Sequence, residues 1–211
     1  MSDLFSNSRP FVEEIYPDVF VLTKFVETPL LFEAINHINR AAPFQKMMTP
    51  NGHKTNIPLT NCGEYGWTSD KTGYRYTQTN PRTNEIWPVM PKIFSNLARQ
   101  AAMKVGFDNF KADACLINQY AIGSKLGSHQ DKNERDFNQP IVSVSIGLPA
   151  VFQVFGDNRS GVNAEYSLQD GDVMVWGKSA RLIYHGIKMV KADPLNPNLK
   201  HRYNITFRKS Q

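Results

Sequence analysis

Apolar and polar residues alternate differently in the two halves of the chain. From about residue 112 onward, short runs of β-branched and aromatic residues are separated by Gly, Pro, Asn and Asp, which is typical of strands. The predicted strands cover 114–120, 141–148, 150–155, 166–168, 172–176, 181–184 and 203–207. Short strands at even spacing favour a double-sheet jelly roll.

The first half of the chain carries two stretches with apolar residues at helical spacing. One covers 29–42 and stops before Pro43, which cannot continue a helix. The other covers 88–105 and is followed by Gly106, a common helix stop. Between them, residues 44–86 are rich in Thr, Asn, Gly, Pro and Tyr, which indicates an irregular flap with short hairpins rather than a separate domain.

Bulk composition narrows the class of protein. The chain of 211 residues suits one domain with extensions, and 41% apolar and 20% charged residues are ordinary for a globular protein. There is no apolar run long enough for a membrane span, and the first six residues show no secretory signal. Cys62 and Cys115 form neither a disulfide framework nor a zinc set, so we expect reduced thiols and a cytoplasmic location.

The net charge of +5 is mild, and a solvated surface explains it as well as an anionic partner does. Local clustering is more informative. Basic residues gather in the flap (Lys46, Lys54, Lys71, Arg75, Arg82) and again in a later segment (Lys125, Lys132, Arg135). Such clusters suit contacts with phosphates.

His129, Asp131 and the distant His185 are a candidate metal site. In an extended segment His129 and Asp131 point the same way, so both reach one ion. Two imidazoles and a carboxylate are the facial set that holds Fe(II) and leaves its other side open. Catalytic zinc is an alternative. A surface hydrogen bond between His129 and Asp131, with His185 as an ordinary core residue, is another.

The C-terminal segment offers a candidate diacid clamp. If residues 202–208 form a strand, one face carries polar side chains (Arg202, Asn204, Thr206, Arg208) and the other is apolar. Two arginines on one face can fork onto the two carboxylates of a diacid, and Asn118 and Tyr120 on another predicted strand add donors. A solvated edge strand is the alternative. A clamp beside the metal site favours iron over zinc and suggests an oxygenase that consumes 2-oxoglutarate.

These residues carry a resemblance to a known family. The matching stretches are 60–63, 66–68, 113–118, Leu126 with 129–132, 140–145, 171–173, 184–186, and 202–204 with 206–208. On them the chain resembles the AlkB family of alkylated-DNA repair dioxygenases, nearly end to end and most clearly from residue 44. The two-His-one-Asp set belongs to the wider 2-oxoglutarate superfamily, whereas the C-terminal segment is much more specific.

The resemblance implies an α+β, mainly β fold with a double-stranded β-helix (jelly-roll) core. It implies an N-terminal extension and helix at 1–43, a nucleotide-recognition lid at 44–90, and a helix with the core at 91–211, all one compact unit. It assigns His129, Asp131 and His185 to Fe(II). It places 2-oxoglutarate among Asn118, Tyr120, Arg202, Asn204 and Arg208, with Arg202 on the distal carboxylate.

The resemblance also implies the reaction. With Fe(II), 2-oxoglutarate and dioxygen, the family dealkylates bases such as 1-methyladenine and 3-methylcytosine in single- or double-stranded DNA, with RNA as an alternative polymer. An aldehyde is released and the base is restored. It assigns the substrate to Trp67, Tyr74, Asn133, Glu134 and Arg159, with Trp67 stacking on the damaged base. A monomer without a membrane partner is expected.

Two positions depart from the family pattern. Asn133 stands where a base-reading carboxylate is expected, and Ile183 stands where an aromatic is expected. A carboxylate favours a cationic methylated base more than an amide does, although the adjacent Glu134 offers partial compensation. Lesion preference is therefore open. Two other functions also remain open at this point: the same chemistry on a protein or small molecule, and a non-catalytic nucleic-acid binding module.

Overall fold

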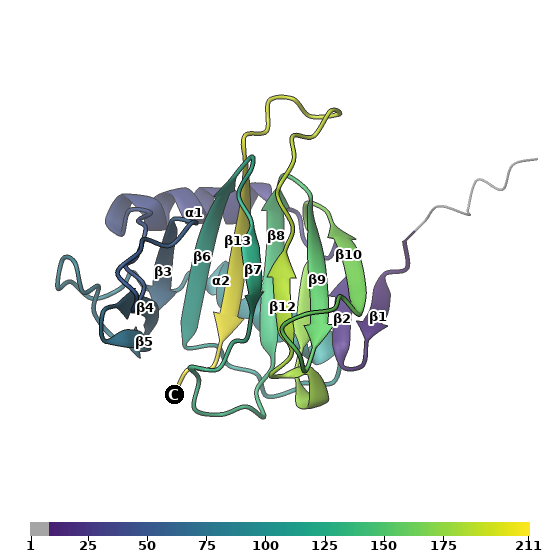
Figure 1. Cartoon of the computed structure of the whole chain (residues 1–211), viewed down its shortest axis with the longest axis horizontal. Helices are drawn as coiled ribbons and strands as arrows, with labels where there is room; N and C mark the ends of the chain where they lie inside the picture. Colours follow the sequence, from purple (N-terminus) through teal and green to yellow (C-terminus); the bar gives the residue numbers. More distant parts are fainter. Residues whose placement is uncertain (1–8) are drawn as a thin grey trace, which may run out of the picture.

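The computed structural model describes residues 9–211, so the first six residues, where we expected no secretory signal, lie outside it. The fold of residues 9–211 consists of two antiparallel sheets, a separate two-stranded hairpin, two α-helices and one 3-10 turn (Figure 1). The larger sheet has the order β1 (Val12–Tyr16), β2 (Val19–Leu22), β11 (Val173–Trp176), β8 (Ile141–Gly147), β13 (His201–Arg208), β6 (Ala114–Ala121), β3 (Leu59–Gly63). The smaller sheet has the order β10 (Ala164–Leu168), β9 (Ala150–Gly156), β12 (Tyr184–Ile187), β7 (Leu126–His129).

The remaining elements are a hairpin and the helices. The hairpin consists of β4 (Gly66–Asp70) and β5 (Gly73–Thr77), and it lies outside both sheets. The helices are α1 (Pro29–Ala41), α2 (Lys92–Lys104) and the short 3-10 turn η1 (Lys178–Ala180). Within residues 9–211, no helix has the length and apolar character needed to cross a membrane.

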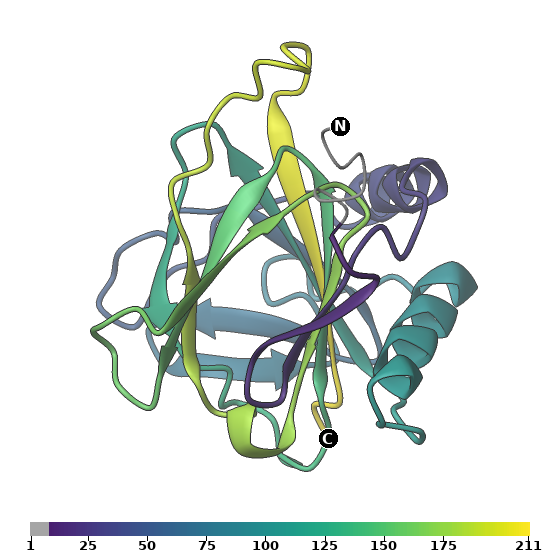
Figure 2. The same cartoon turned by 90° about the vertical axis from the view of Figure 1, so that its right-hand side faces the viewer.

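The layers explain where the core lies. Figure 2 shows α1 and α2 against one side of the larger sheet, with the smaller sheet facing its other side. Residues of both helices pack with those of β6, β8 and β13 in one buried cluster, which includes Ile35, Phe94 and Phe207. A second buried cluster lies between the sheets and includes Phe152 and Trp176. The predicted mainly β jelly roll is confirmed.

Strand β13 separates the core from the space between the sheets. It pairs with β8 on one side and β6 on the other, so it is a central strand. Ile205 and Phe207 enter the helix-side core. The polar side chains of the opposite face are buried as well (Arg202, Asn204, Thr206, Arg208). The predicted alternation is confirmed, and the alternative of a solvated edge strand is wrong.

Several predicted boundaries are wrong for local reasons. The second helix begins at Lys92 rather than at residue 88, because Pro91 has an extended backbone with ψ of 142° and ends a run that contains two prolines. The strand predicted at 181–184 begins only at Tyr184, since η1 and its following turn occupy the preceding residues. Strands β1 and β7 were missed because neither shows regular apolar alternation.

The flap segment is divided between the sheet and the hairpin. Its strand β3 joins the larger sheet beside β6, whereas β4 and β5 pair only with each other among the named strands. The fully buried Asn61 of β3 links the two parts: its amide nitrogen donates to the Trp67 carbonyl and its amide oxygen accepts from the Trp67 backbone N–H, both at 3.0 Å. These two hydrogen bonds fix the hairpin at Trp67, the residue expected to stack on the substrate.

The helix-side core gives a first prediction. Phe94 of α2 is fully buried and meets Phe207 edge-on, with ring centroids 5.8 Å apart. We expect Phe94→Ala to lower the free energy of unfolding by about 3–5 kcal/mol, because a buried aromatic ring leaves a cavity. Leu195→Ala, at an exposed position, should change it by less than about 0.5 kcal/mol. Urea denaturation of the two variants measures both values; equal stabilities would contradict the packing described.

Candidate active site

A cavity of about 630 Å³ opens between the two sheets and under the β4–β5 hairpin. Residues from β6, β13, β7, β12 and the hairpin line it together. Nearly all predicted site residues are among the lining residues (Trp67, Tyr74, Asn118, Tyr120, His129, Asp131, Asn133, Arg159, His185, Arg202, Asn204, Arg208). The exception is Glu134, which the structure does not bring into the cavity.

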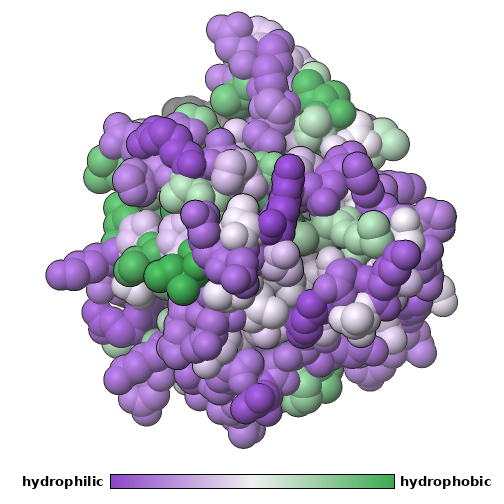
Figure 3. Space-filling model, turned by 90° about the vertical axis from the view of Figure 1, so that its left-hand side faces the viewer, coloured by the Kyte–Doolittle hydropathy of each residue, from purple (hydrophilic) through white to green (hydrophobic). Residues whose placement is uncertain are grey.

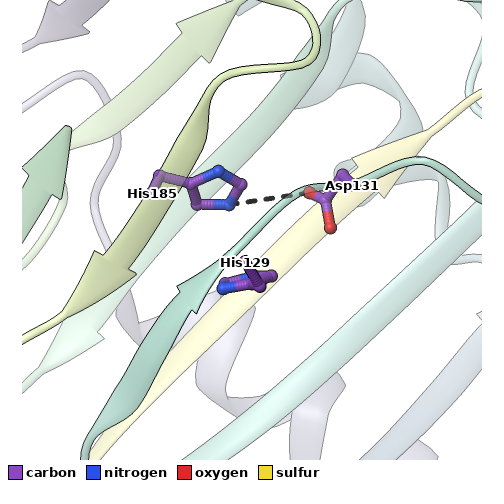
Figure 4. A group of neighbouring side chains, drawn as sticks. All are labelled: His129, Asp131 and His185. Carbon is purple, nitrogen blue, oxygen red and sulfur yellow. Dashed lines mark ion pairs between the residues drawn. The ribbon is translucent and has the colours of Figure 1, made fainter. Parts of the chain in front are cut away.

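His129, Asp131 and His185 converge at one point of this cavity. His129 ends β7 and is the cross-strand partner of His185 in β12, so pairing of the two strands sets the two imidazoles side by side. Their ring centroids are 4.4 Å apart, and Asp131 Oδ2 lies 3.8 Å from His185 Nε2. One ligand atom from each residue lies within 4.8 Å of the others, and Figure 4 shows the three side chains pointing toward one another.

Both imidazoles are oriented for metal binding. The Nδ1 of His129 lies 2.9 Å from the Gly127 carbonyl, and that of His185 lies 3.2 Å from the Ile183 carbonyl. A carbonyl only accepts, so each Nδ1 donates its hydrogen and each Nε2 keeps a free lone pair. The donor set therefore fits a divalent metal, and two nitrogens with one carboxylate suit Fe(II).

The protonation states of His185 and Asp131 agree with metal binding. Burial lowers the pKa of His185 to about 3, so its ring is neutral near pH 7. Burial alone would raise the pKa of the Asp131 carboxyl, but Arg208 and the two imidazoles hold it well below its usual range. Neutral imidazole and ionised carboxylate are the forms that bind a metal.

Arg202 forms no ion pair with any carboxylate of residues 9–211. Its side chain is only 1% exposed, and one nitrogen, Nη2, donates to Ser145 Oγ at 3.0 Å. The other two nitrogens are buried without a hydrogen-bond partner, while the Tyr120 ring lies 5.1 Å from its Cζ. Burial lowers the pKa of Arg202, yet a guanidinium remains charged near neutral pH. Unpaired buried donors of this kind fit a carboxylate group of a ligand.

Arg208, the second arginine of the predicted diacid clamp, has a different partner. Arg208 Nη2 donates to Asp131 Oδ2 at 2.9 Å, so this guanidinium holds a metal ligand. Asn204 also has internal partners, because its amide donates to Ser143 Oγ and the Val144 carbonyl. Asn118 lines the cavity beside it. The two arginines differ in their ion pairs within residues 9–211: Arg208 pairs with Asp131, whereas Arg202 pairs with no carboxylate and keeps two nitrogens without a hydrogen-bond partner.

The residues expected to contact a base lie at the cavity mouth. Trp67 and Tyr74 stack on each other, with centroids 5.5 Å apart and ring planes at 19°. Trp67 Nε1 donates to Asn133 Oδ1 at 3.4 Å, and the Arg159 guanidinium lies over the Tyr184 ring. Figure 3 views the molecule from the hairpin side and shows a largely hydrophilic face.

Sequence reasoning missed several residues around the site. Ser143 and Ser145 of β8 hold the side chains of Asn204 and Arg202. Their alternation with apolar Val142, Val144 and Ile146 was a signal that this strand has one polar, cavity-facing side. Trp176 and Arg181 gave no such signal, because each is a single residue in an apolar or irregular segment.

Comparison with known proteins agrees with this geometry. The model of the 2OG-Fe(II) oxygenase superfamily matches residues 18–208. Alpha-ketoglutarate-dependent dioxygenase AlkB of Escherichia coli (strain K12) is 44% identical over 212 residues, covering 100% of this chain and 98% of that protein. The AlkB homolog of Caulobacter vibrioides is 35% identical over 86% of this chain and 81% of its own length. A solved structure described as that of OsALKBH1 has a TM-score of 0.76 at 26% identity, covering 94% of this chain and 99% of that one.

The chain belongs to the 2OG-Fe(II) oxygenase superfamily and is a dioxygenase of the AlkB type. Its cofactors are therefore Fe(II), with 2-oxoglutarate and dioxygen as co-substrates. His129, Asp131 and His185 would hold the iron, and Arg202 would bind a carboxylate of 2-oxoglutarate.

The two Arg202 nitrogens without a hydrogen-bond partner give a second prediction. We expect Arg202→Met to raise the KM for 2-oxoglutarate about 10- to 100-fold, because a hydrogen-bonded ion pair to the co-substrate is lost. Affinity for Mn(II), measured by calorimetry without 2-oxoglutarate, should stay as in the wild type. The free energy of unfolding without ligand should fall by no more than about 1 kcal/mol, because the only internal hydrogen bond of this side chain within residues 9–211 is the one to Ser145. An unchanged KM would contradict this role of Arg202.

Proposed function

We propose that this protein oxidatively removes alkyl groups from ring nitrogens of bases in DNA, of the 1-methyladenine and 3-methylcytosine type. The observation that carries the proposal is a stacked aromatic pair, Trp67 and Tyr74, over a cavity that holds the metal-binding triad and the unpaired Arg202. The relatives agree: the human protein named nucleic acid dioxygenase ALKBH1 is 30% identical over 130 residues, 61% of this chain and 33% of that protein.

When bound, the iron with 2-oxoglutarate and dioxygen supplies oxidation of the N-alkyl carbon, after which the hydroxylated product releases an aldehyde and restores the base. The chain's own residues bind and orient. Arg202 fixes the co-substrate, and the triad fixes where oxidation occurs. The hairpin holds the base edge above that point, which contributes to the rate through position alone.

The target atom of such a base is hidden in a duplex, so the base must be flipped out or presented on a single strand. Stacking on Trp67 would contribute about 1–3 kcal/mol to holding a flipped base. Lys125, Lys132 and Arg159 line the cavity and carry charge suited to the phosphates. RNA presents the same bases to the same residues and is the second polymer to test.

We propose that residues 44–90 act as the lid over this base. Supporting this, the hairpin of β4 and β5 stands outside both sheets and carries Trp67 and Tyr74. The assignment of Glu134 to base reading has less support, because its carboxylate is buried against Arg181 and Tyr76 rather than directed into the cavity. Action as a monomer and in the cytoplasm stays a prediction.

Incubation with methylated oligonucleotides tests the proposal. Single- and double-stranded DNA and RNA with 1-methyladenine, 3-methylcytosine or etheno adducts are treated with the protein, Fe(II), ascorbate and 2-oxoglutarate. We expect mass spectrometry to show loss of the alkyl group, and Asp131→Ala to abolish both this loss and succinate formation because a metal ligand is missing. Succinate formation without any change in the oligonucleotides would overturn the nucleic-acid substrate and favour the protein or small-molecule alternative.

Asn133 makes the lesion preference testable. It lines the cavity and already accepts from Trp67, so a carboxylate there would face the same base. We expect Asn133→Asp to raise the ratio of kcat/KM for cationic 1-methyladenine over neutral ethenoadenine about fivefold, the size of an exposed ion pair of about 1 kcal/mol.

The matched control is Asn138→Asp, which adds the same charge to the same segment at an exposed position that does not line the cavity. That variant should leave the ratio unchanged. An identical ratio in the wild type and in Asn133→Asp would show that residue 133 does not read the charge of the base.

A further inference from the structure

The three metal-binding side chains are not held in the same way. The two imidazoles come from paired strands, β7 and β12, whose ladder fixes their spacing. Asp131 lies two residues beyond the end of β7, in a connection to β8 that contains neither helix nor strand from Gln130 to Pro140. Backbone groups in such a segment have no ladder partner, so other groups must fix the segment.

Arg181 supplies hydrogen bonds that hold this segment in place. Its buried guanidinium, 3% exposed, uses each of its three nitrogens on this one connection. Nη1 donates to the Asp131 carbonyl at 2.8 Å, Nη2 to Glu134 Oε2 at 3.0 Å, and Nε to the Gln139 carbonyl at 3.0 Å. The Phe137 ring lies 5.3 Å from its Cζ. One side chain therefore holds the segment at its beginning, middle and end.

The position of Arg181 in the chain adds to the argument. It follows η1 and precedes β12, four residues before His185. The next residue, Leu182, accepts from the Gln130 amide through its carbonyl at 2.6 Å. The strand that carries one imidazole is thus joined, just before it begins, to the segment that carries the carboxylate.

Glu134 extends the same cluster toward the lid. Its Oε1 accepts from the Tyr76 hydroxyl at 2.5 Å and lies 3.5 Å from Arg208 Nε. Since Tyr76 belongs to β5, the hairpin and the metal ligand are joined through one buried carboxylate. Arg208 holds the Asp131 side chain from the other direction. The side chain and the backbone of Asp131 are therefore fixed by two different guanidinium groups.

We propose that Arg181 is a positioning residue for the metal site, which sets the backbone of Asp131 relative to the two imidazoles. The claim goes beyond the proposed function, because it concerns metal binding and holds whichever substrate is oxidised. A fork of rigidly arranged donors is needed, since a single point donor cannot reach carbonyls at 131 and 139 and a carboxylate at 134 together.

The main test is Arg181→Lys, with Arg9→Lys as its matched control. Lysine keeps the positive charge beside Glu134, so this carboxylate is not left unpaired. It lacks the planar set of three donor nitrogens that the guanidinium of arginine provides. Arg9 forms a bidentate pair with the fully buried carboxylate of Asp172, although Arg9 itself is 31% exposed, and neither residue lines the cavity. A second variant, Arg181→Met with Glu134→Gln, removes both charges of the pair and keeps an acceptor for Tyr76.

The readouts are the dissociation constant for Mn(II), measured by calorimetry on the full chain, and hydrogen exchange of amides 130–139. We expect both Arg181 variants to bind Mn(II) about 10- to 100-fold more weakly, with faster exchange in this segment, as for partners that orient metal ligands. Arg9→Lys should show neither effect. Rescue of turnover at high Fe(II) is expected in Arg181→Lys.

Three results would overturn the proposal. The first is wild-type Mn(II) affinity in folded Arg181→Lys or, if that variant does not fold, in the double variant. The second is equal loss of affinity in Arg9→Lys, which would show a general effect of stability. The third is failure of both Arg181 variants to fold, which would make Arg181 a folding residue. Each is distinct from failure of the proposed function, which shows as intact metal binding without dealkylation.

Discussion

Alternation of side chains along β13 is the constraint on which the rest of the structure depends. A strand buried on both faces must satisfy two environments, and here one face meets the helix-side core while the other meets the cavity. A shift of one residue would place Arg202 and Arg208 in that core without partners, at a cost of several kcal/mol for each charge. The pairing of β13 with both β8 and β6 therefore fixes the fold and the site together.

The charges around the cavity are arranged in two unlike groups. In one, Asp131, Glu134, Arg181 and Arg208 are joined by ion pairs. In the other, Arg202 has no carboxylate partner among residues 9–211 and lies beside the hydroxyl of Ser145 and the ring of Tyr120. Paired charges give rigidity, whereas an unpaired buried charge gives affinity for an anion. The metal end of the cavity is built in the first way and the end beside Arg202 in the second.

Much of the fold and of the site could be predicted from the sequence, because the informative residues repeat at strand or motif spacing. The triad, the polar face of β13 and the polar pair on β6 are of this kind. Glu134 was predicted beside Asn133 because the two are adjacent in sequence, but the structure separates their contacts: Asn133 accepts from Trp67, whereas the Glu134 carboxylate is buried against Arg181 and Tyr76. Arg181 could not be found, since two of its three acceptors are backbone carbonyls 42 and 50 residues away in sequence, which leave no trace in residue types, and the third, Glu134, is 47 residues away.

The unpaired guanidinium of Arg202 also makes the folding stability of the protein depend on the concentration of its ligand. A ligand that binds only the folded chain raises its stability by mass action, about 2.7 kcal/mol when the free ligand stands at 100 times its dissociation constant. Because the buried donors of Arg202 have no partner within the described residues, filling them adds to folding without breaking any bond already present. If the keto acid is the ligand of this guanidinium, its scarcity would lower the stability of the folded enzyme as well as slow its turnover.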